Sequence, residues 1–560
     1  MDKPSNKQIV AAGLPSNAVA LLAIFASLLS FAWYCMRGEI LLYGDAVAHI
    51  NIARGLFDAR TPGVMQIGTV WLPLPHLLQA PFLLSDKLWI SGIGGSIPSM
   101  AAYVLGVVGI FRLLKVRALG GWAYFGAAVY GLNPSLLYMQ ATAMSESLFL
   151  CLVIWSVYFL DEYRRGLFPP STGHGDKSDV PAWRSLERCG MCLAAAILTR
   201  YDGWVFAFAA GLFTLAITCR WLRHGTTAYS RSRILRSQAA LLLLCALTGG
   251  LWLAHNYYVT GRPLDWFNGP YSAKAIEQRT TQPGAPGYPG RHSMKTAEIY
   301  FMKAAEMNMA EGWPERWILL AAALGTLVAL FHSATYGRWL LLWLPLPFYA
   351  YSVAYGSVPI FLPVWWPCSY YNVRYGLELL PVFAVMLALA GWSFSGVRLK
   401  KAGPVVSWAL IALVSVGYLS SWIGDAHTDW GVRSPKRGPL CYREAVVNSL
   451  DRAPAENFLS GWLKTLPPNA TVMMNTSELV GALQSSGTHL SRVLNNADYI
   501  HWIGALSAPA VGGDYIVAIN DDEVARAIRI NPRGLEEQTI FRSSRGYTVR
   551  IYRSLLRGNR

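Results

Sequence analysis

Residues 41–63 read LLYGDAVAHINIARGLFDARTPG and follow closely on an apolar run, 17–36, that is long enough to cross a membrane. Fourteen positions of this stretch hold five polar or charged residues: Asp45, His49, Asn51, Arg54 and Asp58. Gly44, just before them, permits a tight entry into a helix. We therefore expect a polar helix at the membrane surface, immediately after the first span.

The composition indicates an integral membrane protein. The 560-residue chain is 53% hydrophobic and only 14% charged, whereas soluble proteins carry about 25% charged residues. Apolar runs of about 20 residues recur along it, as membrane spans require. The formal net charge is +16. Because lysine and arginine concentrate in loops, where they orient a membrane protein, this charge does not indicate nucleic-acid binding.

Eleven membrane spans are predicted, at 17–36, 96–114, 119–138, 144–162, 186–199, 202–221, 237–258, 315–332, 339–355, 375–394 and 404–422. If the N-terminus lies inside, every inside segment is basic; the first inside loop, for example, holds Arg112, Lys115 and Arg117. The short outside connections contain little lysine or arginine. This asymmetry predicts an inside N-terminus and an outside C-terminus.

Three long segments then lie outside: 37–95, 259–314, and the tail from about 425 to 560. In the tail, ATVMMN and DYIVAIN are typical of buried strands, and SELVGALQ and DDEVARAIRI of helices. QTIFRSSRGYTVRIY is typical of a closing hairpin. The predicted fold is a polytopic α-helical membrane protein with a small C-terminal α/β extracytoplasmic domain.

The opening cluster has the residue types of a proton-transfer site. A helix over 45–58 places Asp45 and His49 four residues apart on one face. A carboxylate at the water–lipid boundary beside an imidazole can act as a general base. The alternative is an interfacial helix whose polar residues simply face water. For Arg54 and Asp58, also four apart, we expect an intrahelical ion pair.

Further motifs follow in order: TPGVMQIGTVWLPLPH at 61–76, ATAMSESLFL at 141–150, TRYDGWVF at 199–206, NYYVTGRPLDW at 256–266 and NVRYGLELLP at 372–381. With an outer-loop acid after the first span, this order resembles the GT-C superfamily of membrane glycosyltransferases. Protein O-mannosyltransferases and bacterial polyprenyl-phosphate-sugar transferases are the nearest in pattern. The resemblance covers about residues 30–395. It departs from the family's acidic pair, because Ala46 rather than a second acid follows Asp45.

The resemblance implies the GT-C fold and three units. Residues 1–258 form a seven-span module that includes the outer loop 37–95. Residues 259–424 form a variable transmembrane module with the outer loop 259–314, and residues 425–560 form the soluble domain. The implied activity is transfer of a sugar, such as mannose, from polyprenyl phosphate to an acceptor hydroxyl on a lipid, glycan or protein, with inversion.

Such a transfer needs a base for the acceptor hydroxyl and cations for the departing phosphate. Asp45 is the candidate base, with His49 and Glu146 as further candidate catalytic residues. For Glu146 the alternative is a cap at the start of the fourth span. Arg200 and Arg374 are candidate phosphate ligands, because a guanidinium offers paired donors; snorkelling or pairing is the alternative.

The remaining candidates are less specific. Residues proposed to contact substrate are Tyr201, Asp202, Asn256, Tyr257, Lys274 and Tyr371. The aromatic ones among them suit an interfacial belt equally well. Arg200 could pair with Asp202, and Glu378 is expected to be the i+4 partner of Arg374.

No cluster has the ligand set of a metal site, and neither metal nor cofactor is expected.

One rival function is a lipid-linked glycan flippase or transporter, which would carry paired charges deep within its spans and repeat symmetry. A second rival is a glycan ligase on the same fold, which transfers a whole glycan. Only the identity of the donor distinguishes it from a transferase of single sugars. Compact loops and the small tail favour a bacterial inner membrane, with the active site facing the periplasm.

The predicted topology can be tested by labelling single cysteines from one side of the membrane. A cysteine placed within 170–180 and one placed at 525 should differ in accessibility, because the first lies inside and the second outside. Labelling of both from the same side would contradict the eleven-span assignment.

Overall fold

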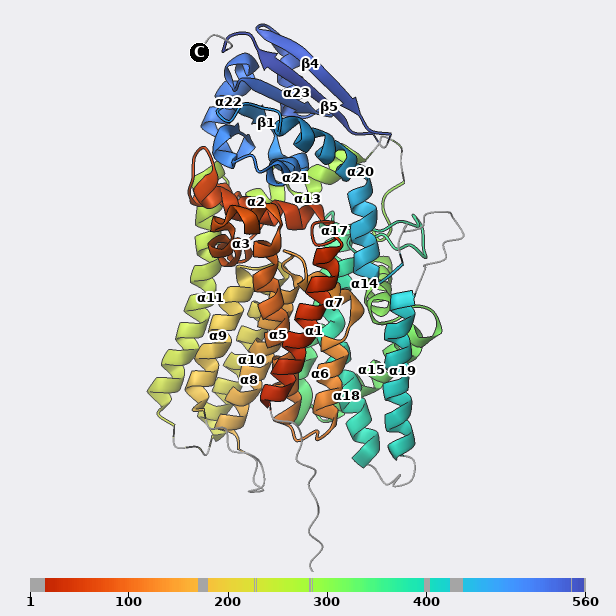
Figure 1. Cartoon of the computed structure of the whole chain (residues 1–560). Helices are drawn as coiled ribbons and strands as arrows, with labels where there is room; N and C mark the ends of the chain where they lie inside the picture. The colour runs from red at the N-terminus through yellow and green to blue at the C-terminus, as the bar shows by residue number, and fades with distance from the viewer. Residues whose placement is uncertain are drawn as a thin grey trace, which may run out of the picture.

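The computed structural model describes residues 16–169, 180–396, 403–423 and 437–557, apart from positions 226, 228, 282, 283, 285 and 545. The predicted boundary at 424/425 and loop residues 170–179 lie outside this described part. Figure 1 shows a helical bundle capped at one end by the C-terminal α/β domain. The helices α2 (Gly44–Asp58) and α3 (Leu74–Gln79) lie between the two.

All eleven predicted spans are helical. They are α1 (Ser16–Met36), α5 (Ile93–Lys115), α6 with α7 (Trp122–Gly131, Pro134–Gln140), α8 (Glu146–Leu167), α9 (Ala182–Ile197), α10 (Asp202–His224), α11 (Arg231–Thr260), α15 (Trp313–Phe331), α16 to α17 (Ser333–Tyr336, Pro345–Tyr355), α18 (Leu380–Gly396) and α19 (Gly403–Ile423). Among the described residues, seven of these segments are helical stretches long and apolar enough to cross a membrane. The other four are interrupted, short or rich in charge at one end.

The third predicted span shows why some spans are interrupted. Pro134 cannot donate to a helical carbonyl, so α6 ends before it and α7 begins at it. Asn133 caps the new start by accepting a hydrogen bond from the Leu136 amide at 2.9 Å.

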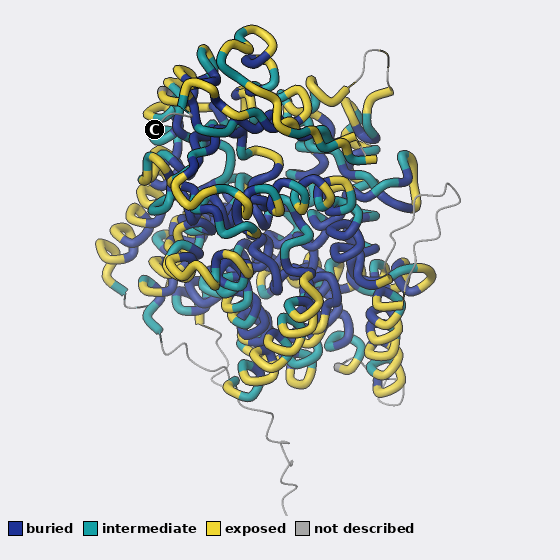
Figure 2. The backbone as a smooth tube through the Cα atoms, turned by 45° about the horizontal axis from the view of Figure 1, so that its top comes forward, coloured by how far each residue is buried: buried dark blue, intermediate teal, exposed yellow. Residues whose placement is uncertain are grey.

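The outer surface of the bundle is apolar. Figure 2 shows exposed stretches along the peripheral helices and buried stretches inside. Exposed large apolar residues include Leu21, Phe25 and Leu29 on α1, Leu243 and Leu251 on α11, and Val405 and Trp408 on α19. An apolar surface of this extent marks a membrane-facing region, so the chain is an integral membrane protein. Because α1 runs toward the capped end (Figure 1), the chain crosses an odd number of times, as eleven spans require.

Two outer segments form the layer beneath the cap. The first builds α2, α3 and α4 (Asp86–Ile90), joined by short 3₁₀ turns, and the second builds α12 (Asp265–Asn268), α13 (Ala273–Thr280) and α14 (Met294–Met309). This layer brings polar residues of the two loops to the end of the bundle that carries the α/β domain.

The predicted tail elements are confirmed. After α20 (Leu440–Leu463), a five-stranded sheet forms with the order β2-β1-β3-β5-β4. Its parallel part is β2 (Val493–Leu494), β1 (Val472–Met474) and β3 (Tyr515–Ile519). Strands β4 (Leu535–Arg542) and β5 (Thr548–Ser554) form the predicted antiparallel hairpin. The helices are α21 (Thr476–Ser486), α22 (Ile500–Ser507) and α23 (Glu523–Ile530).

Buried polar contacts join α2 to the tail. Arg54 forms the predicted ion pair with Asp58 at 2.7 Å, and a second with Asp86 at 2.7 Å. Its guanidinium also lies 3.3 Å from the imidazole of His489 in the tail. Asn51 donates to the Gln484 side chain of α21 at 2.8 Å. Because Arg54 and Asn51 are buried, these contacts fix α2, and with it Asp45, against the tail.

Candidate active site

A cavity of about 690 Å³ lies where the outer end of the bundle meets the α/β domain. Three parts of the chain line it: residues 43–45 at the start of α2, residues 369–372 and 374 at the start of the tenth span, and tail residues that include Arg452, Glu478 and Tyr547. The cavity therefore exists only when bundle, outer loop and tail are folded together.

Asp45 stands in the first turn of α2, at the wall of this cavity. Its side chain is 40% exposed, and its Oδ2 lies 2.5 Å from Nη2 of Arg374. Gly44 comes directly before Asp45. A side chain at this position would approach Arg452, because a Cβ added to Gly44 would lie 3.6 Å from Nε of Arg452. Asp45 thus combines solvent access with a fixed charged partner.

Arg374 is the buried cation of the site. It lies in the 3₁₀ turn η4 (Val373–Leu379) that opens the tenth span, and it is only 8% exposed. Besides Asp45, its guanidinium is 3.3 Å from Glu146 and 3.6 Å from Glu444. Its centre also lies 5.1 Å from the Tyr43 ring, as a cation–π contact. Three carboxylates compensate the cost of burying this charge.

Arg200 lies deeper in the same network. Its guanidinium is 3.3 Å from each of three carboxylates, those of Glu146, Asp202 and Glu378. It also donates to the Tyr349 hydroxyl at 2.7 Å. The expected pairing with Asp202 is therefore present. Arg200 is not among the residues that line the cavity of about 690 Å³.

One expectation about a carboxylate is wrong, and one of the two alternatives for Glu146 is not observed. Glu378 pairs with Arg200 instead of Arg374. Both residues lie in η4, which is a 3₁₀ turn with three residues per turn, so side chains four positions apart do not lie on the same face as they would in an α-helix. Ser145 makes no capping hydrogen bond at the start of α8. Glu146, the first residue of that helix, instead joins the two arginines.

Glu444 is a site residue that sequence reasoning missed. It lies in α20, about 400 residues after Asp45, and accepts hydrogen bonds from the Tyr43 hydroxyl at 2.9 Å and from the Arg374 amide at 3.2 Å. Burial raises the pKa of its carboxyl, and the charge of Arg374 opposes that rise. The adjacent charges Arg443 and Glu444 within the mostly apolar LCYREAVV were the available signal.

No protein-family model and no curated protein matches this chain. Among solved structures it is similar to ArnT from Cupriavidus metallidurans bound to undecaprenyl phosphate, with a TM-score of 0.53 and 12% identity over 96% of this chain and 97% of that one. The chain has the GT-C fold. Similarity to the archaeal oligosaccharyltransferase AglB from Archaeoglobus fulgidus covers 95% of this chain and 74% of that one at 10% identity, with a TM-score of 0.45.

His49 occupies a separate position in this GT-C fold. Its Nδ1 lies 2.8 Å from Nε2 of His76, and its ring lies 4.8 Å from that of Trp71. Among the described residues, its hydrogen bond is to His76, not to Asp45. Burial, aided by the positive charges of Arg374 and Arg200, lowers the pKa of His49 to about 3, so the imidazole is neutral at physiological pH.

The other predicted substrate residues divide into two groups. Tyr371 is 41% exposed and lines the cavity beside Asp45. Tyr201 and Asn256 lie elsewhere: Tyr201 donates to the Val70 carbonyl at 2.9 Å, and Asn256 is buried with its amide on the Trp252 carbonyl. Tyr257 on α11 and Lys274 on α13 are exposed, and neither lines the cavity. Across the described residues, no group of three or more His, Cys, Asp or Glu could hold a metal ion.

The buried histidine pair predicts acid lability. Unfolded histidine binds a proton below pH about 6.5, whereas folded His49 stays neutral to pH about 3. The unfolded state therefore binds more protons below pH 6.5, and stability should fall as the pH falls. For His49 this loss reaches about 2 kcal/mol at pH 5. In detergent, the Tm of His49→Gln should fall less between pH 7 and pH 5 than that of the wild type.

The exposed His501 on α22 provides the matched control, because its replacement by Gln should leave the pH dependence of Tm unchanged. The quantity to compare between the variants and the wild type is the slope of Tm against pH, because any substitution at the buried His49 lowers Tm at every pH. If Tm depends on pH with the same slope in His49→Gln as in the wild type, His49 is not the group that causes the loss of stability in acid.

Proposed function

We propose that this protein is a membrane glycosyltransferase that moves a sugar from a polyprenyl-phosphate donor to an acceptor hydroxyl. The observation that carries the proposal is the pair of Asp45 and Arg374 at the wall of the cavity between bundle and α/β domain. A base and a buried guanidinium side by side are what displacement of a phosphate by a hydroxyl requires. The GT-C fold, shared with a protein crystallised with undecaprenyl phosphate, supports it.

Asp45 acts as the general base in this proposal. As the acceptor oxygen attacks the anomeric carbon, its proton passes to the Asp45 carboxylate, and the bond from that carbon to the phosphate oxygen breaks. Asp45 suits the role because its carboxylate is 40% exposed while Arg374 holds its orientation. A single displacement of this kind inverts the anomeric carbon. The base needs no second acid beside it in sequence, so Ala46 is no obstacle.

Arg374 is the residue proposed to meet the departing phosphate. Its planar group can present two donors to two phosphate oxygens, and it lines the cavity. Arg200 does not line it, and we assign Arg200 a positioning role through Glu146, which contacts both guanidiniums at 3.3 Å. Glu146 is likewise a positioning residue, and Tyr371 borders the space for the donor sugar.

The finer identity of the reaction is inferred from the sequence resemblance. It suggests mannose as the sugar, and the compact loops and small tail favour a bacterial inner membrane with the cavity facing the periplasm. A glycan ligase would use the same base and the same cation, and differs in transferring a whole lipid-linked glycan. Assays with a polyprenyl-phosphate monosaccharide and with a lipid-linked oligosaccharide therefore separate the two.

The base is tested by Asp45→Asn, which preserves size but cannot accept the proton. Turnover should drop by roughly 10²–10⁴-fold, the usual contribution of general-base catalysis. Turnover is measured as sugar transfer from polyprenyl-phosphate mannose in detergent or nanodiscs, with donor binding measured separately. Asp521→Asn, at a 66% exposed acid of the tail that lines neither cavity, is the control and should retain activity. A folded, donor-binding Asp45→Asn enzyme with wild-type turnover would place the base elsewhere.

The cation is tested by Arg374→Lys, which keeps the charge but loses the paired donors. Affinity for polyprenyl phosphate should weaken by about tenfold or more, because a bidentate charge-assisted contact becomes a single one. Equilibrium binding to purified protein measures this. Arg262→Lys, at an exposed ion pair with Asp265, is the control. Unchanged affinity in both Arg374→Lys and Arg200→Lys would assign the arginines to structure alone.

A further inference from the structure

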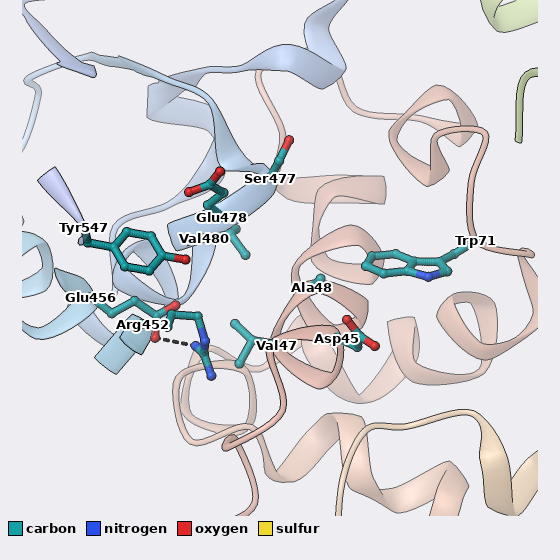
Figure 3. A pocket seen from close by; sticks show the side chains of 11 residues that line it. Asp45, Val47, Ala48, Trp71, Arg452, Glu456, Ser477, Glu478, Val480 and Tyr547 are labelled. Atoms are coloured by element: carbon teal, nitrogen blue, oxygen red, sulfur yellow. Dashed lines mark hydrogen bonds and ion pairs between the residues drawn. The ribbon is translucent and has the colours of Figure 1, made fainter. Parts of the chain in front are cut away.

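A second, smaller cavity of about 210 Å³ also has Asp45 in its lining. The first turn of α2 forms one wall, Trp71 another, and tail residues that include Ser477, Glu478 and Tyr547 the third (Figure 3). Both cavities share Asp45, Arg452 and Glu478 in their linings. The candidate base Asp45 therefore lines both cavities, and neither cavity is complete without the folded tail.

The two cavities differ in charge. The larger one is lined by three acids, Asp45, Asp451 and Glu478, and by two arginines, Arg374 and Arg452. The smaller one is lined by three acids, Asp45, Glu456 and Glu478, and by Arg452 alone. That arginine is 9% exposed and already bound. It contacts Glu456 at 2.5 Å and donates to the carbonyls of Leu41 and Leu42 at 3.2 and 3.0 Å. The smaller cavity thus presents no guanidinium that is free to receive an anion.

Glu478 is the acid best placed to bind a ligand. It is exposed at the start of α21, and its Oε2 accepts a hydrogen bond from Asn520 at 3.2 Å. Within the described part of the chain, its Oε1 has no hydrogen-bond partner. Asp45 is paired with Arg374 and Glu456 with Arg452, and the remaining oxygen of Glu456, Oε1, is buried. Glu478 therefore supplies one open acceptor to the space facing Asp45.

Aromatic and hydroxyl groups complete the lining. Trp71 stands across the cavity from Glu478 (Figure 3), and its indole can pack on the apolar C–H face of a sugar ring. Burial raises the pKa of the Tyr547 hydroxyl to about 12, so this group stays protonated and can donate a hydrogen bond. An aromatic wall with a few polar groups is the usual make-up of a small-molecule site. At about 210 Å³, the space is smaller than a drug-sized pocket of about 300–1,000 Å³.

We infer that this smaller cavity is the acceptor subsite and takes the terminal sugar of a neutral carbohydrate, with Trp71 and Glu478 determining that choice. The inference rests on the proposed glycosyltransferase activity. A sugar hydroxyl can donate to Glu478 while a neighbouring hydroxyl of the same ring faces Asp45. An acceptor that carries a phosphate at this sugar is disfavoured, because the smaller cavity has as many acids as the larger one but lacks Arg374, the cation proposed to meet the donor phosphate. The donor phosphate instead meets Arg374 in the larger cavity.

The inference is tested by acceptor selectivity. Purified enzyme receives polyprenyl-phosphate mannose with one of three acceptors: a neutral trisaccharide, the same trisaccharide phosphorylated on its terminal sugar, or a lysine-containing peptide that bears serine. We expect wild-type kcat/KM to be about tenfold or more higher for the neutral trisaccharide than for the other two. Cleavage of the donor by the wild type without acceptor is measured in parallel, because it reports the proposed activity alone.

Four variants link the selectivity to named side chains. Glu478→Ala and Trp71→Ala should each raise KM for the neutral trisaccharide by about tenfold. The first variant loses one hydrogen bond to a charged group, and the second loses the aromatic face on which the sugar packs. Trp71→Phe should restore part of this loss. Glu478→Lys should reverse the preference toward the phosphorylated trisaccharide. Glu536→Gln, at an exposed acid on β4 away from both cavities, is the matched control.

The outcomes separate the inference from the activity on which it rests. Donor cleavage by the wild type, with selectivity unaffected by Glu478→Lys and by Trp71→Ala, would overturn the acceptor subsite and leave the glycosyltransferase proposal standing. A wild-type preference for the phosphorylated trisaccharide or for the peptide would also overturn it. Absence of donor cleavage and transfer with every donor and acceptor would overturn both.

Discussion

The buried guanidinium of Arg374 is the interaction on which the arrangement of the outer end depends. A cation removed from water costs several kcal/mol unless its partners are close and well placed. Its carboxylates come from three distant parts of the chain: Asp45 from α2, Glu146 from α8 and Glu444 from α20. The network forms only when the outer loop, the bundle and the tail are docked together, so one charge couples their positions.

The second arginine extends this network into the bundle. Arg200 shares Glu146 with Arg374 and adds Asp202 and Glu378. In the low dielectric of a membrane protein, each of these ions is tolerable because another lies within about 4 Å. A site held in this way keeps its geometry without substrate, which is the condition for electrostatic stabilisation of a departing phosphate.

The tail is a structural part of the candidate site as well as a cap above it. Glu444 reaches into the arginine network, Arg452 holds the loop before α2 through the carbonyls of Leu41 and Leu42, and Glu478 borders both cavities. Because the same domain completes the larger and the smaller space, in the proposed reaction it would influence which acceptor reaches Asp45, while the membrane module would position the donor. Arg54 and Asn51 add a second, separate attachment of α2 to the tail.

The sequence by itself determined the membrane class, the eleven helical segments, the tail hairpin and the Arg54–Asp58 pair, because these follow from apolar runs, alternation and i,i+4 spacing, which are local. It also pointed to Asp45, Glu146, Arg200 and Arg374 as candidates. Only the tertiary structure decided which of them meet. Glu146 joins two arginines, His49 turns to His76, and Glu444 enters from about 400 residues away. Buried charges select partners by distance in the folded chain, and no local pattern records that distance.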